Sequence, residues 1–149
     1  MLPITAPSGR DELAERPARY AVRRWRVLVV DRNALVGAVV TRMLKGHEIS
    51  TARSEEAALA ALALDDDVDA ILCSLAAPEM SGFEFAEVLS ERYPRLRPRL
   101  VFMLGAASTP EMLDRLARTD VPRVVKPLRY APLVTQIAMA VAISATSRA

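Results

Sequence analysis

The sequence has a single cysteine and no long apolar run, and each absence excludes a class of protein. One cysteine, Cys73, allows no disulfide within the chain, and its position inside an apolar run predicts a buried core residue. No segment reaches the roughly 18 uninterrupted apolar residues of a membrane span. The first 20 residues contain no apolar stretch of the kind that directs secretion. We therefore expect a cytoplasmic protein with no membrane partner.

A strong excess of one charge is also absent. The net charge is +2 at pH 7, although 18 of the 20 basic residues are arginine. A near-neutral total gives no general attraction for nucleic acid, which would need a local basic patch. One candidate patch is the arginine-rich N-terminus, and the other is a cluster around Tyr93 that we interpret as a solvated loop. That cluster contains Arg92, Arg95, Arg97 and Arg99.

Hydrophobic residues make up 52% of the 149 residues and charged residues 26%, which is typical of one globular domain. Residues 1–24 differ from the rest, because they hold five arginines, three acids and three prolines that interrupt any long pattern. We expect a mobile tail over residues 1–24 and a folded domain over residues 25–145.

Short apolar runs alternate with helical patterns from Trp25 onward. The first helical pattern carries Leu35, Val39 and Met43 and can end at Gly46, and Ser54 can cap the second. The predicted strands are 26–30, 47–52, 69–74, 99–104 and 121–125, and the later helices are 82–93, 108–118 and 132–145. Five strands that alternate with five helices predict an α/β fold, a doubly wound parallel sheet covered on both faces.

In doubly wound folds the working site lies at the carboxyl ends of the strands. The polar residues expected there are Asp31, Arg32, Ser74 and Lys126, with Gly105 after the fourth strand. The segments around them are VLVVDRN, DAILCSLAAPEMSGFEF, VFMLGA and VVKPL. Together they resemble the signature segments of response-regulator receiver domains, over residues 26–143. The resemblance implies a flavodoxin-like sheet of order 2-1-3-4-5 and a place in two-component (phosphorelay) signal transduction.

In that family, a phosphohistidine on a partner kinase passes its phosphoryl group to an aspartate that ends the third strand. This sequence keeps two of the six positions that the family uses, Asp31 of the acidic pair and Lys126. Four positions depart from the pattern, and the chain therefore resembles a degenerate receiver, or pseudo-receiver. They are Arg32 in the acidic pair, Ser74 at the phosphoacceptor, Gly105 at the phosphate-sensing threonine and Arg123 at the switch aromatic.

These departures predict a site without phosphotransfer. Serine forms no acyl phosphate, so we expect Ser74 to remain unmodified and its hydroxyl to bond to nearby backbone. Arg32 and Ser74 replace two anionic groups, so we expect no Mg²⁺ or other cofactor. Asp31 and Lys126 should then form a direct ion pair, and the Lys126–Pro127 peptide should be cis. His47 has no second histidine to share a metal and is interpreted as a surface residue.

The favoured function is a phosphorylation-independent interaction module, not an enzyme. The last helix has no charged residue over 131–143, so a protein partner or a second copy is expected to cover its surplus apolar surface. The expected interaction face joins the fourth helix, the fifth strand and the last helix. Its apolar candidates are Val134, Met139 and Ala142, and its basic edge is Arg115, Arg118 and Arg123. The alternatives are an active phosphoacceptor that uses an unorthodox residue and, less favoured, nucleic-acid binding through the arginine-rich segments.

Overall fold

The computed structural model describes residues 24–76, 81–105, 107 and 109–148. The predicted tail therefore lies almost entirely outside the described residues, as do residues 77–80 of the DAILCSLAAPEMSGFEF segment. Within the described part of the chain, five parallel strands form one sheet of order β2-β1-β3-β4-β5. The strands are β1 (Arg26–Val30), β2 (Glu48–Ala52), β3 (Ala70–Leu75), β4 (Leu100–Leu104) and β5 (Arg123–Val125). The predicted flavodoxin-like topology is confirmed.

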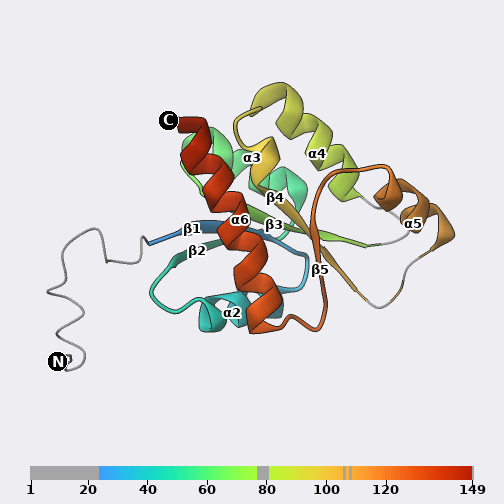
Figure 1. Ribbon diagram of the computed structural model, residues 1–149, viewed down its shortest axis with the longest axis horizontal. Coiled ribbons are helices and arrows are strands. Elements are labelled where there is room, and N and C mark those ends of the chain that lie inside the picture. Colours follow the sequence, from blue (N-terminus) through green and yellow to red (C-terminus); the bar gives the residue numbers. More distant parts are fainter. Residues whose placement is uncertain (1–23, 77–80, 106, 108, 149) are drawn as a thin grey trace, which may run out of the picture.

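Helices cover both faces of this sheet (Figure 1). One apolar core joins the sheet to α2 (Ala34–Met43) and α6 (Tyr130–Arg148). A second core, on the other face, joins it to α3 (Glu55–Leu64), α4 (Ser81–Arg92) and α5 (Pro110–Ala117). A short 3-10 helix, η2 (Arg97–Arg99), leads into β4. Among the described residues, no helix combines the length and the apolar composition that crossing a bilayer requires.

Local signals in the sequence explain where the helices begin and end. The Ser54 hydroxyl accepts a hydrogen bond from the Ala57 amide and caps α3 as predicted, and Asn33 caps α2 by accepting from Leu35. After α2, Gly46 adopts a φ of +90°, which only glycine reaches without strain. The chain can therefore turn sharply into β2.

The apolar residues that recur at helical spacing in α2 do not form its buried face. Leu35 and Val39 are 70% and 41% exposed, whereas Gly37 and Val40 are buried. The reason is the close approach of α2 to β2, because a Cβ at position 37 would lie 2.5 Å from Cγ2 of Thr51. Only a glycine permits this approach. With Gly37 against the sheet, Leu35 and Val39 lie on the exposed side of the helix.

The arginine cluster around Tyr93 is not the solvated loop that the sequence predicted. Arg99 is fully buried, and its guanidinium donates a hydrogen bond of 2.6 Å to the Val68 carbonyl. Two other members form ion pairs, Arg95 with Asp66 at 3.4 Å and Arg97 with Asp120 at 3.1 Å. The cluster therefore ties the amino-terminal ends of the strands together, which removes much of the free basic surface that a nucleic acid would need.

His47 is not a simple surface residue either. Because β1 pairs with β2 from Arg26 and Glu48 onward, the residues just before them lie side by side. The His47 ring stacks on Trp25 with centroids 4.5 Å apart, and its Nδ1 accepts a 2.8 Å hydrogen bond from the Trp25 amide. Burial, with a smaller contribution from Arg24, lowers the pKa of His47 and favours this neutral, accepting form.

The Gly37 contact gives a stability prediction. We expect Gly37→Ala to lower the urea midpoint, because overpacking costs about 1–3 kcal/mol whereas alanine gains roughly 1 kcal/mol over glycine in a helix. Adding Thr51→Ser, which removes the clashing methyl group, should restore most of the loss. Gly105→Ala is the control, since no heavy atom lies within 4 Å of its added Cβ. A Gly37→Ala protein as stable as the unmodified chain would contradict the close approach.

Candidate functional site

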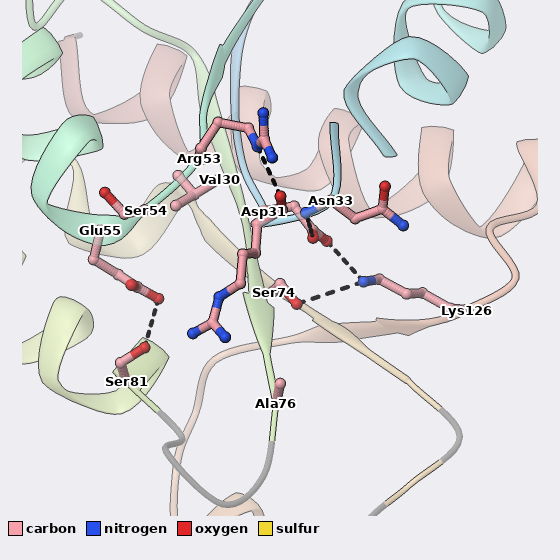
Figure 2. A pocket seen from close by; sticks show the side chains of 11 residues that line it. Val30, Asp31, Asn33, Arg53, Ser54, Glu55, Ser74, Ala76, Ser81 and Lys126 are labelled. Atoms are coloured by element: carbon pink, nitrogen blue, oxygen red, sulfur yellow. Dashed lines mark hydrogen bonds and ion pairs between the residues drawn. The ribbon is translucent and has the colours of Figure 1, made fainter. Parts of the chain in front are cut away.

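A pocket of about 240 Å³ lies at the carboxyl ends of β1, β2 and β3, where the topology predicted the site (Figure 2). The turn after each of these strands contributes to its wall, and Lys126 enters from the segment after β5. The polar side chains of the wall include those of Asp31, Arg32, Arg53, Ser54, Glu55, Ser74, Ser81 and Lys126.

The predicted ion pair between Asp31 and Lys126 is present. Lys126 Nζ lies 2.7 Å from Oδ2 of Asp31, whose side chain is almost completely buried (Figure 2). The other oxygen, Oδ1, accepts a 2.8 Å hydrogen bond from the Asn33 amide. Both carboxylate oxygens are therefore engaged, which compensates the burial of the charge. The Lys126–Pro127 peptide is cis, as expected.

Ser74 lies on β3, one residue before the strand ends. Its expected partner was nearby backbone, but the structure places the Lys126 ammonium 3.5 Å from its Oγ (Figure 2). The reason is that Lys126 reaches across the end of β3 to meet Asp31 and passes the hydroxyl on its way. An ammonium has only donors, so it cannot take the proton that would activate the serine.

The remaining positions of the resemblance are more dispersed. Arg32 lines the pocket and is exposed, and its backbone carbonyl accepts a 2.7 Å hydrogen bond from Nε of Arg53. Gly105 follows β4 and Arg123 begins β5, and neither lines the pocket. The structure therefore brings together Asp31, Arg32, Ser74 and Lys126, and leaves the other two apart.

One part of the pocket wall, formed by the turn after β2 and the start of α4, was not predicted from the sequence. Ser81 donates a 2.8 Å hydrogen bond to Oε2 of Glu55, and the same oxygen lies 3.9 Å from Sγ of Cys73. Cys73 is fully buried, as predicted, and this burial, with the nearby Glu55 and Asp31 charges, raises the pKa of its thiol well above the ordinary value. Asp31 and Ser74 were predicted because the working site of such a sheet lies at the carboxyl ends of its strands. The same reasoning applied to the end of β2 predicts Arg53, Ser54 and Glu55 as site residues.

The residues of the pocket do not fit Mg²⁺, the ion that receiver domains hold. Magnesium needs near-octahedral oxygen ligands, usually including one or two carboxylates that are free to bind it. Here one pocket carboxylate already accepts from Lys126 and the other from Ser81. Among the described residues, no group of three or more His, Cys, Asp or Glu side chains could hold a metal ion.

The expected interaction face is only partly as the sequence suggested. Met139 is 55% exposed and Ala142 also lies at the surface, but Val134 is half-buried and packs against the core. Val134 lies on the same side of the helix as the buried Leu133 and Ile137, so its side chain contributes to the core and not to a partner surface. Ile143 is the further exposed apolar residue of α6 on the side of Met139.

The three arginines do not form one edge. Arg115 stacks its guanidinium over the Phe83 ring of α4 at 4.1 Å, and Arg118 pairs with Asp114 at 2.7 Å. Both line a groove between α4 and α5, on the side of the sheet opposite α6. Arg123 is exposed on the edge strand β5.

The fold is identified by comparison with solved structures. No protein-family model matches the chain, and no curated protein matches it. Among solved structures, NtrX from Brucella abortus superposes with a TM-score of 0.70 at 22% identity, over 85% of this chain and 28% of that one. Chemotaxis protein CheY4 from Vibrio cholerae matches with a TM-score of 0.64 at 24% identity, over 79% and 99%. A response regulator receiver domain protein from Clostridium thermocellum gives 0.66 at 17%, over 79% and 94%.

The chain therefore has the fold of response-regulator receiver domains, and it spans 28% of the length of NtrX but nearly all of the length of CheY4. At these identities the comparison concerns the fold.

The ion pair gives a second stability prediction. We expect Lys126→Met to destabilise the fold by about 1–3 kcal/mol, because it leaves the buried Asp31 carboxylate without its cation. This loss is smaller than that for a fully buried pair, because Lys126 is partly exposed. Asp31→Asn should cost less, since Lys126 can turn toward solvent. In urea unfolding, the double variant should be more stable than Lys126→Met alone, and strictly additive losses would argue against the pair.

Proposed function

We propose that the chain is a degenerate receiver domain, a cytoplasmic signalling module that binds a protein partner without phosphotransfer and without enzymatic activity. The observation that supports this proposal is the Lys126 ammonium, which contacts both the Asp31 carboxylate and the Ser74 hydroxyl. The arrangement occupies the groups that an acyl-phosphate switch would need.

Phosphoryl transfer to Ser74 would need a base for the hydroxyl proton and a cation for the transferring phosphoryl group. Of the two pocket carboxylates, Asp31 accepts from Lys126 and from the Asn33 amide, and Glu55 accepts from Ser81. Lys126 could stabilise negative charge, yet it donates to Ser74 and removes no proton. The pocket thus supplies cations without an available base, which argues against an active phosphoacceptor on an unorthodox residue.

A phosphodonor experiment tests this part of the proposal. Incubation with acetyl phosphate and Mg²⁺ should leave the intact mass unchanged, because no group in the pocket is activated as a nucleophile. The matched control is the Arg32→Asp, Ser74→Asp variant, which restores the two carboxylates and should show both a phosphoryl adduct and tighter Mg²⁺ binding by calorimetry. A stoichiometric adduct on Ser74 of the unmodified chain would contradict the proposal.

The partner surface that we propose is the outward face of α6. Leu133, Ile137 and Ala140 face the core, whereas Met139 and Ile143 remain exposed. No charged residue interrupts positions 131–143, so this helix lacks the polar stripe of an ordinary surface helix. Exposed apolar surface of this kind is typical of a contact with another protein or with a second copy.

Charge placed on this face should break the contact. We expect Met139→Glu, and separately Ile143→Glu, to weaken self-association or partner capture at least about tenfold, because an unpaired carboxylate would be buried in the interface. Sedimentation measures self-association, and pull-down with the intact chain measures partner capture. Val134 is unsuitable for this test because it packs against the core.

The matched control is Leu64→Glu. Leu64 is 90% exposed at the end of α3, on the opposite side of the sheet, so its replacement should leave association unchanged. Circular dichroism checks that each variant is folded. If association survives both α6 variants, the interface lies elsewhere and this face is not the partner surface.

A further inference from the structure

The hydrogen-bond ladder between β1 and β2 ends on a side chain. Next to the first strand pair, the Glu48 amide donates a 2.8 Å hydrogen bond to the Trp25 carbonyl. In a regular parallel ladder, the Trp25 amide would then donate to the carbonyl two residues before Glu48, that of Gly46. It donates instead to Nδ1 of His47, at 2.8 Å. The last bond of this ladder therefore depends on an imidazole.

The turn at Gly46 explains this exchange of acceptors. Its φ of +90° is far from the extended backbone of a strand, so its carbonyl is not aligned with the ladder. The ring of the next residue, His47, stacks on the Trp25 indole with centroids 4.5 Å apart and planes at 18°. Trp25 also packs against the apolar core on the α2 and α6 face of the sheet. The His47 ring thus fixes the point at which the chain enters β1.

An imidazole accepts a hydrogen bond only while one of its ring nitrogens is unprotonated. A protonated His47 has two donors and no acceptor, so the Trp25 amide would face an N–H group. The amide is partly buried, and losing its acceptor there is costly. The attraction of a cation for the indole face opposes this loss, but it cannot supply the missing acceptor. Protonation therefore favours separation of the two residues.

The charged groups around His47 do not favour its protonation. They are Arg24 and Arg26 on the side of β1, and Lys45 and Glu48 on its own segment. Glu48 pairs with Arg26 at 3.5 Å, and among the described residues no carboxylate forms an ion pair with the His47 ring. Burial, with a smaller contribution from Arg24, lowers the pKa of His47 below its ordinary value. The ring is therefore neutral at pH 7 and becomes charged in acid.

We propose that the Trp25–His47 contact is an acid-sensitive link, in which protonation of His47 releases Trp25 and loosens the entry of the chain into β1. Nδ1 takes the proton, and water replaces it as the acceptor for the Trp25 amide. This device goes beyond the proposed partner binding, and it uses no residue of the pocket or of α6. The chain contains one tryptophan and one histidine, so both members of the contact can be observed without background.

Acidification of the unmodified chain from about pH 7.5 to about pH 5, where histidine titrates and carboxylates largely do not, tests the proposal. The tryptophan emission should shift to longer wavelength and acrylamide should quench it more strongly, with a midpoint below about pH 6.5. Hydrogen exchange measured by NMR gives the protection of the Trp25 amide relative to the intrinsic rate at each pH. This protection should fall about tenfold, the change expected for the loss of one hydrogen bond.

Stability should follow the same protonation. The unfolded chain has the ordinary histidine pKa and the folded chain a lower one. The contribution of His47 is therefore complete above about pH 6.5 and is lost as the pH falls through the folded value. The urea midpoint should fall more on acidification in the unmodified chain than in His47→Asn, because asparagine offers a neutral acceptor that does not titrate.

Two variants separate the acceptor from the ring, and circular dichroism verifies that both are folded. In His47→Asn, emission and amide protection should not change with pH over this range. His47→Phe keeps a ring for stacking but offers no acceptor, so the Trp25 amide should exchange freely at both ends of the range. Constant emission and protection in the unmodified chain, or an equal response in His47→Asn, would overturn the proposal. Either result leaves the α6 interface and the pocket unaffected, since neither contains Trp25 or His47.

Discussion

A buried carboxylate at the end of β1 needs a cation, and Lys126 provides it from 95 positions further along the chain. β3 and β4 separate β1 from β5 in the sheet, so the lysine has to reach across the end of β3. Its ammonium therefore bonds to Asp31 and contacts Ser74 in the same position. This one pair engages the Asp31 carboxylate and brings the ammonium to the Ser74 hydroxyl, and the proposed function rests on these two contacts.

The pair also links the pocket to α6. Lys126 ends the pocket wall, and α6 begins four residues later, at Tyr130. The other connection expected from the resemblance to receiver domains, through positions 105 and 123, has no counterpart here, because Gly105 has no side chain and the exposed Arg123 does not line the pocket. In the proposed function, the face of α6 is therefore not switched from the pocket.

Much of the fold follows from local signals that agree with one another. Short runs between the helical patterns predicted all five strands, and the rule that parallel strands place their carboxyl ends at one edge predicted the meeting of Asp31 and Lys126. The misplaced residues are those whose environment depends on neighbours far away in the sequence. The orientation of α2 follows from the close contact between Gly37 and Thr51. Arg99 is buried where it donates to the Val68 carbonyl, and His47 is partly covered by the Trp25 ring. Spacing within one segment carries no information on such contacts.

The single cysteine has a practical consequence for the study of this chain. Cys73 is fully buried in the second apolar core, and its thiol is held in the unreactive protonated form. A thiol reagent can reach it only when β3 separates from its neighbours, so the rate of labelling measures the opening of the central sheet. A cysteine introduced at the surface would react in the native state. Fluorophores or spin labels can thus be attached at one chosen site without replacing the native residue.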